Sequence, residues 1–370
     1  MILKNCTFYN EFFEKEFGDI EVENGIIKQI GILGDGRDMS GLTLIPGFVD
    51  IHIHGCGGGD SSDADSESLD KITAELAKNG ITSFCPTTMT LPADRLKKIV
   101  AVIADYKSKG AKIAGINLEG PFIAMSKKGA QNGDYVREGT VSEFDGLSAA
   151  CGGMIKLITI APEAFDSDDF IKNISSKCTV SIGHSAATSD ECQKAVNLGV
   201  THATHLYNAM TPMTHREAGI VGTVLDNDNV TCELICDGGH ICPAVIRNTF
   251  KMLGEDRAVV VSDSMRGAGL GEGEFELGGQ QVFVKPDGKY AILADGTIAA
   301  SITNIHREFK NLIEFGIDFK TALKACTINP AKAIKEDSRI GSIAVGKCAD
   351  FVFLDENLNV KEVYIDGIPA

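Results

Sequence analysis

Eight apolar segments rich in β-branched residues recur along the 370-residue chain, and most are followed by a segment with the apolar spacing of a helix. Apolar strands that alternate with helices predict a parallel sheet with helices on its faces. Eight such units, starting roughly 20–45 residues apart, predict a closed (β/α)8 barrel, the TIM barrel. The segments span residues 44–55, 80–89, 112–122, 155–163, 179–187, 200–210, 230–240 and 258–265. We therefore expect an α/β fold.

A doubly wound open sheet is the alternative, but no G-x-G-x-x-G motif opens a helix after an early strand. The two ends of the chain differ from the middle. Residues 1–46 and 338–370 contain short strand-like pieces separated by turns rich in glycine and aspartate. We expect these ends to pair into one small β-sandwich domain beside a barrel that spans residues 47–337.

Nearly every apolar segment ends in a side chain that can bind a metal or transfer a proton. In a (β/α)8 barrel the carboxyl ends of the strands form the face that carries the active site. A random distribution of the eight histidines would not place so many of them at strand ends. The residues at these ends are His52, His54, Thr87, Glu119, Glu163, His184, His202, His205, Asp237, His240 and Asp263.

The segment "PGFVDIHIHG" places two histidines one residue apart at the end of the first predicted strand. Side chains alternate between the faces of a strand, so His52 and His54 point the same way. Two adjacent imidazoles contribute little to packing, but they suit a metal ion. The alternative is a pair of hydrogen-bonded core histidines.

A catalytic zinc-type site needs about three histidine or carboxylate ligands and one open position. Glu119, His184 and His205 each follow a different strand and supply one such set. A metal there lowers the pKa of a bound water to about 7. Asp263 follows "AVVVS" and is placed to take a proton from that water and pass it to a leaving group. His52, His54 and Asp263 could complete a second metal position or share the first.

The formal net charge of −16 argues against nucleic acid or an anionic membrane as a partner, since both are bound through basic patches. The eleven cysteines show no repeated spacing and do not indicate a disulfide framework. The first residues, "MILKNCTFYNEFFEKEF", carry acids where a signal peptide needs an apolar core. No apolar stretch approaches the roughly 18 residues of a membrane helix. These features predict a cytoplasmic protein.

Seven motifs resemble the metal-dependent amidohydrolase superfamily and, within it, the N-acetylglucosamine-6-phosphate deacetylases. They are "PGFVDIHIHG", "NLEGPF", "SIGHSAAT", "THATHLYNAMTPM", "HREAGIVG", "ICDGGH" and "VSDSM". The resemblance covers nearly the whole chain, and "LEGPF" and "HLYNAM" are specific to the deacetylase branch. Other branches bridge two metals with a carboxylated lysine after the fourth strand. This chain has "LITIAPE" there, without a lysine, and offers Glu119 instead.

The resemblance implies hydrolysis of the N-acetyl group of an amino-sugar phosphate. Glu119, His184 and His205 would hold the main metal, and Asp263 would be the catalytic acid and base. The metal would be divalent zinc, iron, cobalt or manganese, with one or two ions per subunit. The family implies a homodimer in which Arg216 reaches the neighbouring subunit's pocket. The implied substrate-binding residues are Ala130, Gln131, Asn208, Ala209, Arg216, His240, Ile298, Ala299 and Ala300.

The chain departs from its relatives at several of these positions. Some members have histidine in place of Gln131, where it polarises the substrate carbonyl, and lack the H-x-H pair. We hypothesise that a second metal held partly by His52 and His54 takes over that task here. Ala300 replaces the usual glycine and Ile305 the usual methionine, which could narrow the sugar pocket or only repack it.

Three other functions stay open. The substrate could be the galactosamine epimer, or a cyclic amide as in the dihydroorotase relatives. The chain could also be a metal-stabilised regulator that binds a sugar phosphate without turning it over. The presence of Asp263 argues against such a regulator, because a binding protein has no use for a proton carrier there.

Overall fold

The structure is a computed structural model that describes residues 1–286 and 288–370. All eight predicted barrel strands form, and consecutive strands pair in parallel. The strands are β6 (Phe48–Ile53), β9 (Ile81–Thr88), β11 (Ile116–Glu119), β12 (Ile155–Ile160), β13 (Thr179–Ile182), β14 (Val200–Ala203), β15 (Thr231–Leu234) and β16 (Ala258–Val260). A short strand β10 (Lys112–Ile113) also pairs with β9.

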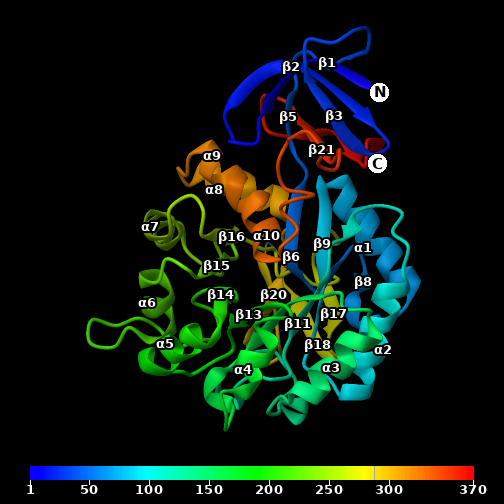
Figure 1. The fold of residues 1–370 in the computed structure, drawn as a ribbon. Coiled ribbons are helices and arrows are strands. Elements are labelled where there is room, and N and C mark those ends of the chain that lie inside the picture. Colours follow the sequence, from blue (N-terminus) through cyan, green and yellow to red (C-terminus); the bar gives the residue numbers. More distant parts are fainter. Residues whose placement is uncertain (287) are drawn as a thin grey trace.

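Backbone hydrogen bonds bring the end of the last strand against the first. The amide of Asp263 donates to the carbonyl of His52 at 2.9 Å, and the amide of His54 donates to the carbonyl of Ser264 at 2.9 Å. The sheet therefore closes into the predicted barrel, which fills the centre of Figure 1. A helix follows each strand: α1 (Ser66–Lys78), α2 (Ala93–Asp105), α3 (Val141–Ala150), α4 (Asp169–Ile174), α5 (Ser189–Leu198), α6 (Gly219–Asp226), α7 (Pro243–Leu253) and α8 (Ile305–Glu314). Two further helices, α9 (Phe319–Cys326) and α10 (Ile328–Ala333), come after α8.

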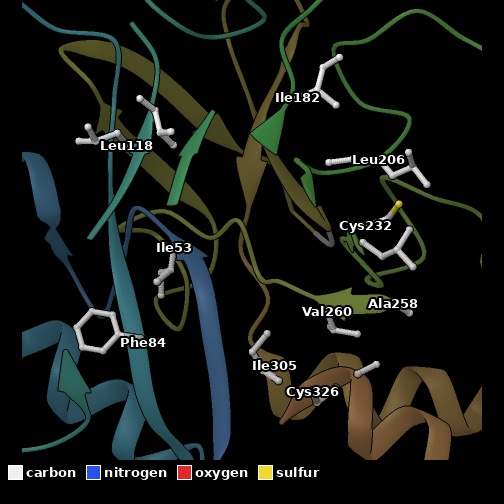
Figure 2. Packing of buried hydrophobic residues seen from close by; sticks show 14 of the residues in the cluster. Ile53, Phe84, Leu118, Ile182, Leu206, Cys232, Ala258, Val260, Ile305 and Cys326 are labelled. Carbon is white, nitrogen blue, oxygen red and sulfur yellow. The ribbon is translucent and has the colours of Figure 1, made fainter. Parts of the chain in front are cut away.

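Helix α5 shows how the sequence determines where a helix begins and ends. The Thr188 side chain accepts from the amide of Glu191, whose carboxylate accepts in turn from the amide of Thr188, so a capping box starts the helix. Gly199 follows the helix with a φ of 122°, a conformation that favours glycine. Apolar side chains pack together between the barrel strands and the helices that surround them. Figure 2 shows Ile182, Cys232, Ile305 and Cys326 among these side chains.

The two ends of the chain pair into one β domain beside the barrel, as predicted, and its strands form one hydrogen-bonded sheet. Its order is β23-β22-β21-β5-β1-β2-β3, with β4 paired to β1. The strands are β1 (Ile2–Tyr9), β2 (Lys15–Glu23), β3 (Ile26–Gly31), β4 (Arg37–Asp38), β5 (Thr43–Pro46), β21 (Phe351–Leu354), β22 (Val360–Ile365) and β23 (Ile368–Pro369). Both halves of the sheet contribute side chains to one apolar cluster, including Leu3, Phe8 and Phe353. Figure 1 shows both termini in this sheet, at the top of the view.

One part of the fold was not predicted. Between β16 and α8 the chain forms an antiparallel four-stranded sheet. Its strands are β17 (Gly273–Leu277), β18 (Gln280–Val284), β19 (Tyr290–Ile292) and β20 (Ile298–Ser301). A short hairpin of β7 (Gly55–Cys56) and β8 (Gly59–Asp60) follows β6. Over the described residues, every helix is too short or too polar to cross a lipid bilayer.

Candidate metal centre and active site

The carboxyl ends of the barrel strands surround a cavity of about 410 Å³. Residues that end four different strands line it: Glu119 closes β11, and His184, His205 and Asp263 follow β13, β14 and β16. Far-separated parts of the sequence thus meet at one face, as the strand-end pattern predicts.

Glu119 lies at the centre of this face and is buried. Its Oε1 is 3.0 Å from Nε2 of His184, 2.9 Å from Nε2 of His205 and 3.4 Å from Nε2 of His52. Its Oε2 is 3.1 Å from Nε2 of His54. We call His52, His54 and Glu119 the His52–His54 group, and Glu119, His184 and His205 the His184–His205 group. Each group places its ligand atoms within metal-binding distance of one another, and the two groups share Glu119.

The other ring nitrogens decide which way the imidazole lone pairs point. The Nδ1 atoms of His184 and His54 lie 2.8 Å and 3.3 Å from the carbonyl oxygens of Lys127 and Thr87. A carbonyl oxygen only accepts, so Nδ1 carries a hydrogen in both rings, and in the neutral ring that a metal requires Nε2 presents a lone pair. In that neutral form both lone pairs point toward Glu119.

The donor set fits a divalent cation. Nε2 of His52 is buried and has no hydrogen-bond partner among the described residues. Burial raises the pKa of the Glu119 carboxyl, but the charges of His52 and His184 outweigh this and hold that pKa well below its usual range. An ionised carboxylate and several imidazole nitrogens are the ligands that zinc, iron, cobalt and manganese accept.

Three residues of the site have an unusual backbone. His184, His205 and Asp263 have φ values of 47°, 27° and 46°, in the left-handed region that non-glycine residues rarely adopt. Such conformations cost about 1–3 kcal/mol each and cluster at functional sites. Here each one turns the chain directly after a barrel strand and aims the side chain into the cavity.

Asp263 lies beside the His52–His54 group, because the ends of β16 and β6 are neighbours in the closed barrel. Its Oδ1 is 3.4 Å from Nε2 of His54 and 3.6 Å from Nε2 of His52. Its backbone is fixed on both sides, because its amide donates to His52 and its carbonyl accepts from the amide of Ser301 at 2.8 Å. The carboxylate is thus held beside the ligand atoms and open to the cavity.

Most of the residues implied for the substrate also line the cavity, namely Ala130, Gln131, Asn208, Ala209, His240, Ile298 and Ala299. Gln131 donates from Nε2 to Oε2 of Glu119 at 2.7 Å and accepts from the amide of Thr90 at 2.7 Å. Nδ1 of His240 lies 2.7 Å from Oδ2 of Asp237. Each of these two polar side chains is therefore held in one orientation.

Two of the implied residues and one substituted position lie elsewhere. Ala300 is buried beneath the lining with Met265, and Ile305 is buried in the barrel core. These two substitutions therefore change the packing behind the cavity. Arg216 is exposed on the loop between β14 and α6, outside the cavity of its own chain.

Several residues at this site had not been singled out from the sequence. Lys127 lines the cavity, and among the lining residues that the structure describes it is the one lysine or arginine. The motif "KKG" beside Gln131 was the available signal. Glu233 is fully buried behind the histidines, in the middle of β15, and no strand-end rule would find it. Thr297 comes from the unpredicted four-stranded sheet region.

Comparison with known protein families matches residues 43–368 to the amidohydrolase family. The chain belongs to the amidohydrolase family. The N-acetylglucosamine-6-phosphate deacetylase of Bacillus subtilis (strain 168) is 36% identical to this amidohydrolase over 326 residues, which are 86% of this chain and 82% of the relative. The N-acetylgalactosamine-6-phosphate deacetylase of Escherichia coli O157:H7 is 32% identical over 329 residues, 88% of this chain and 86% of the relative.

Solved structures give the same family and fold. A mutant N-acetyl-D-glucosamine-6-phosphate deacetylase from Mycobacterium smegmatis, in complex with N-acetyl-D-glucosamine-6-phosphate, matches this amidohydrolase with a TM-score of 0.93 and 29% identity. The match covers 100% of this chain and 98% of that chain. The barrel with its terminal β domain is therefore the fold of these deacetylases.

Proposed function

We propose that this amidohydrolase removes the acetyl group of N-acetyl-D-glucosamine 6-phosphate and yields glucosamine 6-phosphate and acetate. The observation that carries the proposal is the convergence of Glu119, two metal-binding histidine pairs and Asp263 on one cavity. The identity to N-acetylglucosamine-6-phosphate deacetylases over most of the chain supports the substrate class.

Asp263 is the group that moves protons in the proposed reaction. Water adds to the acetyl carbon, and Asp263 accepts a proton from that water. Asp263 then returns the proton to the amide nitrogen as the carbon–nitrogen bond breaks, because an amine leaves poorly without it. The short distances from Asp263 to His52 and His54 place its carboxylate beside the ligand atoms where the water would be activated.

The two metal groups would hold the cation or cations. When bound, a divalent cation there lowers the pKa of water and polarises a carbonyl group. We propose two ions per chain, because two groups share Glu119 and each has its own pair of histidines. Zinc, iron, cobalt and manganese all suit such ligands.

The phosphate needs cationic partners, and this chain offers few of them at the cavity. We propose that Lys127 and His240 bind the phosphate together with Asn208 and Ala209. Arg216 would complete the pocket of a second subunit, since it is exposed and lies outside the cavity of its own chain. A homodimer is therefore part of the proposal.

N-acetylgalactosamine 6-phosphate is the second candidate substrate, because one relative of comparable identity is named for it. Acetate release should be measured with the 6-phosphates of both N-acetyl sugars and with unphosphorylated N-acetylglucosamine. We expect the highest kcat/KM for the glucosamine 6-phosphate derivative. A higher value for the galactosamine epimer would replace the first candidate with the second, and no acetate from either would overturn both.

Two further proposals concern the whole protein. We place it in the cytoplasm, which the free thiols of its eleven cysteines support. We also divide it into a barrel of residues 47–337 and a terminal domain of residues 1–46 and 338–370. The pairing of β5 with β21 supports this division.

A further inference from the structure

A buried carboxylate lies directly behind the metal-binding histidines. Oε2 of Glu233, on β15, accepts from Nδ1 of His52 at 2.9 Å and from the amide of His205 at 3.0 Å. Its Oε1 lies 3.2 Å from Nε2 of His202, and Nδ1 of His202 lies 2.5 Å from Oγ1 of Thr231. Glu233 and His202 are both fully buried. The Glu233 carboxylate thus contacts three histidines: the rings of His52 and His202 and the backbone amide of His205. The Thr231 hydroxyl contacts the other ring nitrogen of His202.

Glu233 acts differently on the two metal groups. It binds the ring of His52 itself, which fixes the hydrogen on Nδ1 and turns Nε2 toward Glu119. In the His184–His205 group it reaches only a backbone amide, that of His205. Loss of the carboxylate therefore removes the support of one ring in the His52–His54 group, while both rings of the other group keep their position.

We propose that Glu233 is a positioning residue that gives the His52–His54 group its affinity for a cation, and that His202 holds Glu233 in place. A carboxylate behind a ligating imidazole fixes its tautomer and raises its basicity, and removal of such a partner costs about 10–100-fold in metal affinity. The inference rests on the proposed function only in treating the His52–His54 group as a metal site.

The role of Glu233 is tested by measuring how many Mn²⁺ ions each chain binds and how tightly. Full-length protein is freed of metal with a chelator and dialysed against a series of Mn²⁺ concentrations. We expect the wild type to bind two ions per chain and to give the electron paramagnetic resonance spectrum of an exchange-coupled pair, because Glu119 is shared. Glu233→Gln should lose affinity at one site by about 10–100-fold and show an uncoupled single ion at concentrations that fill both sites in the wild type.

A matched control separates positioning from stability. Thr179→Val removes a buried hydrogen bond, from Oγ1 of Thr179 to the carbonyl of Ala333 at 2.6 Å, at the amino end of β13. It should lower the melting temperature and keep both ions. His202→Gln serves if Glu233→Gln does not fold, and we expect a smaller loss at the same site.

Two results would overturn the proposal: wild-type affinity at both sites of the folded Glu233→Gln or His202→Gln variant, or a wild type that binds one ion. Failure of the proposed function looks different. The metal data would then follow the expected pattern while no N-acetyl sugar phosphate is hydrolysed.

Discussion

The Nε2 atoms of His184 and His205 lie only 3.0 Å apart. The two residues occupy equivalent places after β13 and β14, whose register pairs Ser181 with His202. Oε1 of Glu119 lies 3.0 Å and 2.9 Å from the same two nitrogens. Nδ1 of His184 donates to a carbonyl oxygen, so in the neutral ring that binds a metal Nε2 presents a lone pair at this crowded point. A bound cation would relieve the repulsion between these ligand atoms.

Metal removal should therefore destabilise the whole barrel face. We expect dialysis against a chelator to lower the melting temperature and abolish deacetylation, because a ligand that binds only the folded state stabilises it by about 2.7 kcal/mol at 100 times its Kd. Adding back zinc, manganese, cobalt or iron should restore both, as measured by calorimetry and acetate release. An unchanged melting temperature in protein shown to be metal-free would contradict the assignment of these ligands.

The sequence predicted the eight strands and the face on which their polar ends meet. Strands of a parallel sheet are covered by helices and are therefore apolar along their length, whereas the residues at their carboxyl ends line the active-site face and are polar. It could not predict the strand register, which alone brings His184 beside His205. Glu233 was missed because it lies within β15 and not at its carboxyl end. Nothing in the neighbouring residues indicates that its side chain contacts histidines from other strands. The sheet of β17 to β20 was missed because its strands are only three to five residues long, too short for an alternating pattern to stand out.

Asp263→Asn tests the proton carrier. The amide keeps the size of the carboxylate but cannot accept the proton, so we expect kcat to fall by about 10²- to 10⁴-fold. Metal content and KM should change little, since the ligand pairs around Glu119 stay in place. Kinetics and metal analysis on the same preparation check both statements. Unimpaired kcat in a metal-loaded variant would remove Asp263 from its role.

Lys127→Met tests the phosphate contact within one chain. We expect KM to rise at least about 10-fold with kcat largely kept, because a charge-assisted hydrogen bond contributes about 1.5–3 kcal/mol. The backbone carbonyl of Lys127, which holds His184, is unaffected by the substitution. Lys128→Met is the matched control and should keep the wild-type KM, since Lys128 lies outside the cavity lining. Equal effects of the two variants would argue against a specific contact.

Variants of Arg216 test directly whether this side chain acts in the pocket of the other subunit. Arg216→Met should raise KM in every pocket, and Asp263→Asn should inactivate every pocket. Subunits mixed by denaturation and refolding should form hybrid dimers in which one pocket has both Asp263 and the partner subunit's Arg216. We expect activity at low substrate concentration to exceed the sum of the two parents. Mixtures that never exceed that sum would show that Arg216 does not act across subunits.

Glu308 should make stability depend on pH. It lies on α8 and is fully buried, and neither carboxylate oxygen has a hydrogen-bond partner among the described residues. Burial, and then the charge of Asp237, raise the pKa of this carboxyl well above its usual range. The folded protein therefore keeps the proton, while the unfolded chain releases it above about pH 4.3. Stability is lost as pH rises from there toward the folded pKa, by about 1.4 kcal/mol per pH unit.

Glu308→Gln has no proton to lose and nearly the same shape. We expect the variant to melt at a higher temperature than the wild type at pH 8, with a smaller difference at pH 5, when metal-loaded proteins are compared by calorimetry. Glu314→Gln, at the exposed end of the same helix, should leave the difference independent of pH. If Glu308→Gln were less stable than the wild type at pH 8, the buried carboxyl would have to be ionised and paired, contrary to the geometry around α8.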